Sequence, residues 1–268
     1  SQGHLRRKPW TPKTLEEMDA ERSLQLFRER FESAGDFTFL FVGNFDTGEL
    51  ESLVEKYVAS LPAGSDESWR DPDVRPAAGK IDRTVRKGVD RKSRVRMKFG
   101  GDITFNYQER YWVYSMVSAL RTRLREEMRE AIGGTYSVSA YASIEHYPAP
   151  RFEINIGFGC APDQVEMLID AVRREIENLQ SELLEESYLT KVAQTQLRER
   201  EVSLERNSFW LHILHYYDWH GEDVKTVLDF ENYVNALSLS DIRDSARRCF
   251  GTPNVATFIL LPEEQPVH

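Results

Sequence analysis

Apolar residues in the middle of the chain recur at intervals of three and four between about Asn106 and Gly133. They are Trp112, Val113, Met116, Val117, Leu120, Leu124 and Met128. This period predicts a long amphipathic helix whose apolar face packs on a core. Gly133 and Gly134 follow the pattern, and glycine tolerates the positive φ at which many helices end. We therefore expect the helix to turn directly into a strand at residues 135–145.

The remaining hydrophobic patterns predict further helices and strands. We expect helices at residues 14–34, 46–61, 162–183, 185–206, 209–219, 223–237 and 241–250, the last with Ser240 as its N-cap. We expect strands at residues 36–43, 81–87, 93–99, 135–145, 151–158 and 255–261. The strand at 36–43 is almost continuously apolar, which is typical of a buried central strand. Gly100 and Gly101 are expected to break the strand at 93–99.

The order of these elements predicts an α+β fold. Its sheet is antiparallel or mixed, and its helices pack mainly on one face of that sheet. A chain of 268 residues with 40% hydrophobic content can form one large domain or two small ones. Because no linker rich in proline and serine divides it, we expect a single domain at residues 13–268. Residues 1–12 are interpreted as a linker or a cloning remnant.

The charge and the cysteines exclude several classes of protein. A formal net charge of -9 argues against nucleic-acid binding. The basic stretch at 80–98 lacks aromatic residues and is interpreted as the solvated face of a hairpin. No apolar run approaches the roughly 18 residues of a membrane span, and no signal peptide opens the chain. Cys160 and Cys249 favour two reduced thiols over a disulfide.

Histidines are the first candidates for a metal site, and three of them lie close together in the sequence. His212, His215 and His220 fall on a predicted helix, but no carboxylate stands at the spacing of a zinc-binding helix motif. We interpret them as structural and expect this chain to bind no metal. The sequence also lacks a nucleophile elbow, a P-loop and a dinucleotide-binding glycine motif.

Arg129 and Tyr136 remain as candidates, on either side of the glycine turn. Arg121, Arg125 and Arg129 stand four residues apart, and like charges at that spacing repel unless a negative group lies nearby. One interpretation is structural: Arg129 pairs with Glu126, Glu127 supports Arg123, and Tyr136 caps the core end of the strand. The other interpretation is that Arg129 and Tyr136 form part of a functional site.

Four stretches of the chain favour the functional interpretation. They are residues 24–62, residues 124–140 (LREEMREAIGGTYSVSA), residues 152–172 and the closing residues 258–263. Together they resemble the pitrilysin/insulysin superfamily of zinc peptidases, the inverzincins, and most closely the C-terminal, non-metal domain of PqqL-like bacterial zinc proteases. The resemblance implies a two-layer α/β sandwich of the type found in mitochondrial processing peptidase.

The resemblance also implies a role for the candidate pair. In that family two halves close around a peptide, the zinc is held by an H-x-x-E-H helix in the first domain, and an arginine and a tyrosine seven residues apart reach across from the C-terminal half. Arg129 and Tyr136 match that spacing, whereas an H-x-x-E-H helix is absent from this sequence. Both side chains donate hydrogen bonds, which suits an oxygen that gains negative charge during peptide hydrolysis.

The implied function is therefore the substrate-binding C-terminal domain of a zinc endopeptidase. Its partners would be a peptide or unfolded protein and the N-terminal zinc-binding half of the same polypeptide, without which we expect the chain to be inactive. The alternative is a non-catalytic scaffold or interaction domain of the same fold. The resemblance suggests the bacterial periplasm, with the cytoplasm as the other possibility.

Overall fold

The computed structural model describes residues 4–64, 68–132 and 137–263. The chain divides into two compact units. The smaller contains residues 1–76 and 203–224, and the larger contains residues 77–202 and 225–268. The expectation that residues 13–268 form a single domain stays a prediction.

The larger unit is built on one five-stranded mixed sheet. Its strands are β1 (Lys80–Arg86), β2 (Ser93–Asp102), β3 (Val138–Glu145), β4 (Arg151–Cys160) and β5 (Val255–Leu261). They lie in the order β1-β5-β2-β4-β3. β1 runs parallel to β5, and the other neighbouring pairs are antiparallel.

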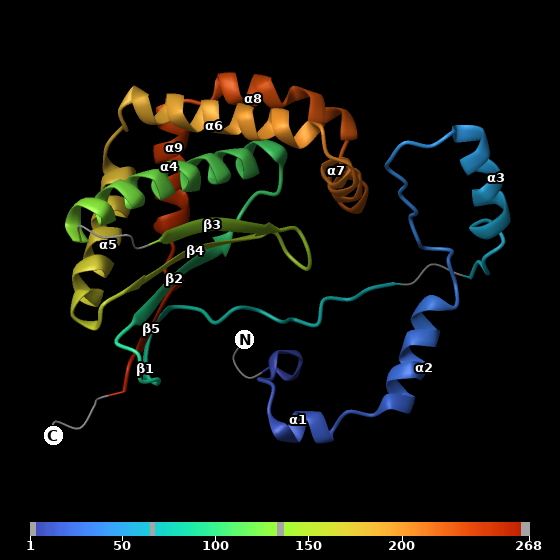
Figure 1. Cartoon of the computed structure of the whole chain (residues 1–268), viewed down its shortest axis with the longest axis horizontal. Coiled ribbons are helices and arrows are strands. Elements are labelled where there is room, and N and C mark those ends of the chain that lie inside the picture. The colour runs from blue at the N-terminus through green and yellow to red at the C-terminus, as the bar shows by residue number, and fades with distance from the viewer. Residues whose placement is uncertain (1–3, 65–67, 133–136, 264–268) are drawn as a thin grey trace. The chain divides into compact units, whose positions relative to one another are not determined.

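Helices cover one face of this sheet. α4 (Tyr107–Ile132), α5 (Val165–Ser181) and α9 (Leu239–Phe250) pack against the strands, and α6 (Glu186–Leu204) and α8 (Phe230–Ala236) lie over α4 (Figure 1). Short 3-10 helices occupy Pro162–Gln164 and Val224–Asp229. Leu120 of α4, Ile154 of β4 and Leu168 of α5 are fully buried in the shared core. The predicted fold class and the long central helix are confirmed.

Strand β2 shows both the success and the failure of the sequence pattern. Its odd-numbered residues from Ser93 to Phe99 are buried, while Arg94 and Arg96 are exposed, as the alternation predicts. The prediction that Gly100 and Gly101 end the strand is wrong, because β2 continues to Asp102. A Cβ on Gly101 would lie 2.9 Å from the Phe152 ring, so this glycine allows close packing across the ladder instead.

The basic stretch at residues 80–98 is not a hairpin. β5 lies between β1 and β2, so the two strands that flank this stretch are not neighbours in the sheet. The error has a physical cause: β1 and β5 are joined by backbone hydrogen bonds between strands that lie far apart in the sequence, with Lys80 opposite Val255. Patterns within a short window contain no information about such pairs.

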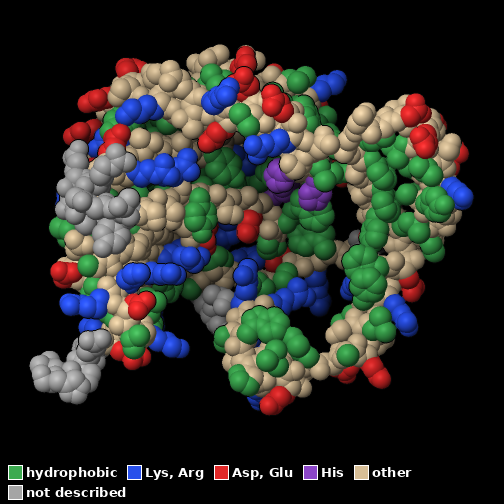
Figure 2. Space-filling model, viewed as in Figure 1, with side chains coloured by type: hydrophobic (Ala, Val, Ile, Leu, Met, Phe, Trp, Pro, Cys, Tyr) green, Lys and Arg blue, Asp and Glu red, His purple; other side chains and the backbone are tan. Residues whose placement is uncertain are grey.

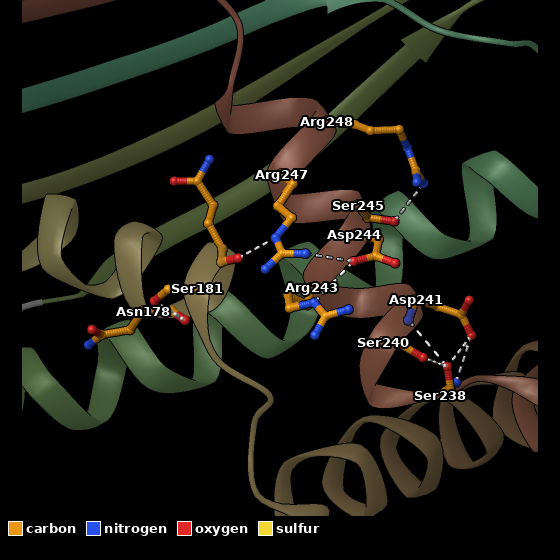
Figure 3. A network of polar contacts seen from close by, with 11 residues as sticks. Asn178, Ser181, Ser238, Ser240, Asp241, Arg243, Asp244, Ser245, Arg247 and Arg248 are labelled. Atoms are coloured by element: carbon orange, nitrogen blue, oxygen red, sulfur yellow. Dashed lines mark hydrogen bonds and ion pairs between the residues drawn. The ribbon is translucent and has the colours of Figure 1, made fainter.

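Helix α9 begins two residues earlier than expected. Ser238, not Ser240, is its N-cap: the Ser238 Oγ accepts a hydrogen bond from Asp241 N at 3.2 Å, and Asp241 Oδ2 accepts one from Ser238 N at 2.9 Å. This reciprocal arrangement is a capping box. At the other end of α9, Arg247 Nε donates to the backbone oxygen of Gln180 at 2.6 Å, which ties α9 to the end of α5 (Figure 3).

The smaller unit contains short helices. They are a 3-10 turn at Leu5–Arg7, α1 (Pro12–Glu16), α2 (Ala20–Phe31), α3 (Thr47–Tyr57) and α7 (Asn207–His220). The prediction of one helix at residues 14–34 is wrong. Asp19 divides it, because its side chain accepts a hydrogen bond from Arg22 N at 2.9 Å and so caps α2.

The predicted strand at residues 36–43 is also not formed. The segment is extended but has no partner strand within the described part of the chain. Phe39 and Phe41 are 42% and 47% exposed, so the expectation of a buried central strand is wrong for this structure.

The cysteines agree with the expected reduced pair. Cys160 and Cys249 are free and buried, and burial raises the pKa of the Cys160 thiol to about 11 and that of the Cys249 thiol to about 12. Among the residues that the structure describes, no helix is long and apolar enough to span a membrane.

Candidate functional site

The candidate site lies at the end of α4, where the chain leads into β3. Leu124 and Met128 bury this end of the helix in the core. Arg129 belongs to the last turn of α4, although its side chain lies outside the described residues, as does all of Tyr136. The prediction that these two side chains act together therefore stays a prediction. What the structure does describe is the set of contacts that holds this end of α4.

The first contact joins α4 to α5 through a buried ion pair. Glu175 is 6% exposed and accepts two hydrogen bonds from the Arg123 guanidinium, one from Nε and one from Nη2 at 3.2 Å. The pair raises the pKa of Arg123, chiefly through the hydrogen bond to Glu175. Two parallel hydrogen bonds fix the orientation of both side chains as well as their separation.

The second contact joins α4 to α6 through Glu126. One carboxylate oxygen accepts a hydrogen bond from the Tyr188 hydroxyl, and the other accepts one from Lys191 Nζ at 3.1 Å. The hydrogen bond from Tyr188 lowers the pKa of Glu126, and the same bond raises the pKa of Tyr188 to about 12. The cations of Arg123 and Lys191 also lie 5.3 and 4.7 Å from the centre of the Tyr188 ring.

Arg123 and Glu127 do not form the pair that was expected within α4, whereas the expected pair of Arg129 with Glu126 involves a side chain outside the described residues. Both oxygens of Glu126 are occupied by α6, and Glu127 accepts a hydrogen bond from Arg174 of α5 at 3.1 Å. Arg123 is likewise paired with α5 rather than with Glu127. The acidic residues of α4 thus connect the helix to its neighbours, because bonds between helices satisfy buried or half-buried charges that solvent reaches poorly.

Comparison with known proteins identifies the family. Residues 20–196, which include α4 and β3, match the family described as the peptidase M16 inactive domain. The chain belongs to this family. The resemblance inferred from the four sequence stretches is therefore confirmed.

Curated relatives of this M16 domain are zinc proteases by name. The chain is 21% identical over 257 residues to the probable zinc protease PqqL of Escherichia coli, covering 93% of this chain and 27% of that protein. It is 24% identical over 158 residues to the probable zinc protease PqqL of Haemophilus influenzae, covering 58% of this chain and 17% of that protein. The chain thus spans about a quarter or less of the length of these relatives.

Solved structures confirm the fold of the M16 domain. The periplasmic protease PqqL from Escherichia coli matches with a TM-score of 0.79 and 20% identity, over 96% of this chain and 28% of that protein. A peptidase M16 inactive domain from Pseudomonas fluorescens matches with a TM-score of 0.73 and 16% identity, over 96% of this chain and 61% of that one.

The described residues of this M16 domain do not form a metal site. Across residues 4–64, 68–132 and 137–263, no group of three or more His, Cys, Asp or Glu side chains is arranged to hold a metal ion. His212, His215 and His220 all lie on α7, where His215 packs against Trp219 and His220 packs against Tyr216. The expectation that this chain binds no metal stays a prediction.

The residues that hold α4 could not be predicted from the sequence. Glu175 and Tyr188 lie on helices that were predicted, but nothing in their local sequence marks them as partners of α4. They stand 52 and 62 residues from Arg123 and Glu126 respectively. Only the alignment of α4, α5 and α6 in the fold brings them together.

Proposed function

We propose that this chain is a substrate-binding domain of a zinc-dependent endopeptidase. Arg129 and Tyr136 contact the backbone of a bound peptide, while the zinc is held by another part of the polypeptide. The observation that carries this proposal is the family match, because the matched residues 20–196 contain both Arg129 and Tyr136. The names of the curated relatives support the reaction class and the metal.

The chemistry of the two side chains suits this role. A guanidinium and a phenol both donate hydrogen bonds, and neither needs to change its charge to do so. Donors held in advance near a peptide carbonyl stabilise the oxygen as it gains charge, and the benefit depends on their being fixed in position. The contacts of Glu126 and Arg123 support this requirement, because they tie the last three turns of α4 to α5 and α6.

The proposal is tested by Arg129→Ala and Tyr136→Phe in the natural gene product. Each change removes one donor, and we expect kcat/KM for peptide cleavage to fall by about 100-fold, the usual effect of losing one such donor. Arg125→Ala is the matched control, since Arg125 is exposed one turn earlier on the same helix. Peptidase activity equal to that of the parent in both variants, with Arg125→Ala also unchanged, would exclude the binding role.

A non-catalytic scaffold is the second candidate. It is favoured by the word "inactive" in the description of the family and by the absence of a metal group among the described side chains. A natural gene product that lacks peptidase activity, and that carries no H-x-x-E-H sequence anywhere along its length, would support this alternative.

The substrate class and the compartment are part of the same proposal. The substrate is a peptide or unfolded protein, in keeping with the protease names of the relatives, and the compartment is the bacterial periplasm. The Escherichia coli PqqL protein is named as a periplasmic protease, which supports the proposed compartment.

A further inference from the structure

The first 76 residues have almost no core of their own. Among the side chains described at residues 4–64 and 68–76, none is buried. Yet α2, α3 and the segment between them carry many large apolar side chains that are about 40–60% exposed. These are Leu24, Leu26, Phe27, Phe31, Phe37, Phe39, Phe41, Phe45, Leu53 and Tyr57. Because these apolar side chains are not buried, no hydrophobic stabilisation offsets the entropy cost of ordering the segment.

Four of the aromatic side chains form one continuous exposed row. The rings of Phe27 and Phe31 stack with centroids 4.6 Å apart, and the Phe31 and Phe37 centroids are 5.7 Å apart. Phe37 and Phe39 continue the row at 6.3 Å. Figure 2 shows hydrophobic side chains gathered along the segment that joins α2 to α3. The row belongs partly to a helix and partly to an extended segment.

The extended segment has the residue pattern of a buried β-strand, but no strand lies beside it in the described part of the chain. Phe37, Phe39 and Phe41 alternate along it with Thr38, Leu40 and Val42, so both of its faces are largely apolar. In the described part of the chain, no backbone group of residues 38–43 bonds to another backbone group. Such groups need partners when they are buried, and a strand obtains them from an adjacent strand.

The start of the segment is held against the chain that follows α3. Ala34 N donates to the backbone oxygen of Pro62 at 2.8 Å, and Gly64 N donates to Ser33 Oγ at 2.6 Å. Gly35 permits this approach, because a Cβ at that position would lie 2.8 Å from the Gly64 oxygen. These contacts restrain the extended segment between α2 and α3. The segment therefore needs little reorganisation to bind a partner.

We propose that residues 36–43 add as a β-strand to the edge of a β-sheet carried by polypeptide outside these 268 residues. An apolar face of that sheet covers Phe37, Phe39 and Phe41, and its edge supplies the missing backbone hydrogen bonds. The Escherichia coli PqqL chain is long enough to contain such a sheet, because its match to 96% of this chain uses only 28% of its own length. This inference concerns the smaller unit and does not depend on the peptidase role.

Hydrogen exchange on the natural gene product tests the proposal. We expect the amides of residues 38–43 to exchange more slowly than unprotected amides by on the order of 100-fold or more, because strand amides exchange only after opening. Exchange at unprotected rates would overturn the proposal. It would also be overturned by a natural gene product no longer than this chain, or by protection that appears only at concentrations where the product self-associates.

A pair of substitutions makes the test specific. Phe39→Asp places a charge where the apolar face of the sheet would lie, and we expect it to abolish the protection of residues 38–43. Phe258→Asp on β5 is the matched control, because Phe258 is 40% exposed and Phe39 is 42% exposed. Protection that survives Phe39→Asp, or that is lost equally in both variants, would contradict the proposed sheet.

Discussion

Arg123 shows how much a single side chain contributes at the candidate site. It is the main partner of the buried Glu175 carboxylate, so Arg123→Ala would leave a negative charge in the core with little to stabilise it. Removing one member of such a pair costs several kcal/mol, and the Arg123 side chain is 23% exposed, which reduces the effect. We expect the free energy of unfolding to fall by about 2–4 kcal/mol, measured by urea denaturation.

The control for this prediction lies on the same helix as Glu175. Arg173 pairs with Asp170 at 3.1 Å, but both side chains are about half exposed, so solvent screens the interaction. Arg173→Ala should change the free energy of unfolding by no more than about 0.5 kcal/mol. Equal effects for the two variants would show that the Arg123 and Glu175 pair adds nothing beyond an ordinary surface contact.

Residues of the α4 stripe could be predicted from the sequence, but their polar partners could not. Leu120 and Leu124 are fully buried, as the helical period requires. Glu126 instead depends on Tyr188, 62 residues away, and no local pattern distinguishes Tyr188 from other tyrosines. Hydrophobic periodicity reports which side of a helix is buried, whereas a polar pair depends on how two helices are aligned.

At the scale of an element, the start of α9 separates two serines that look alike in the sequence. Ser238 forms the capping box with Asp241, while the Ser240 hydroxyl bonds only to the Ser238 hydroxyl among the contacts described. We expect Ser238→Ala to lower the free energy of unfolding by about 1 kcal/mol. Ser240→Ala should lower it by about 0.5 kcal/mol or less, as for most surface substitutions. Thermal or urea denaturation measures both, and the reverse order would contradict the observed cap.

Elements with a strong pattern and a partner in the chain were predicted most accurately. The strand at residues 255–261 has the predicted limits, because its almost continuous apolar run and the proline that follows it agree with its place in the sheet. The segment at residues 36–43 has an equally clear pattern, yet it forms no strand. The difference lies in the partner: β5 pairs with β1 and β2, whereas residues 36–43 have no strand beside them in the described chain.

For the whole molecule, the sequence predicts the fold class but not the order of the strands. The mixed sheet with helices on one face follows from the sequence of elements. The position of β5 between β1 and β2 does not, since it joins the last strand of the chain to the first. The composition of the two units does not follow from local patterns either, because the smaller unit combines residues 1–76 with residues 203–224, which lie far apart in the sequence.

The two units should differ sharply in their resistance to proteolysis when the 268-residue chain is studied alone. Trypsin cleaves after Lys and Arg where the backbone can open, and opening is easiest where few apolar side chains are buried. No described side chain of residues 4–76 is buried, whereas α4 carries a fully buried stripe. We therefore expect the first cuts in brief digestion, located by mass spectrometry, to fall at Arg28, Arg30 or Lys56.

Arg125 provides the internal control for this experiment. It is exposed, but it lies on α4, so surface exposure alone should not make it a cleavage site. Early cleavage at Arg125 would contradict the expected difference between the units. The same digestion of the natural gene product should spare Arg28, Arg30 and Lys56, because a sheet that pairs with residues 36–43 would also cover the apolar faces of α2 and α3. Since the sites are identical in both samples, only the missing partner can account for a difference between them.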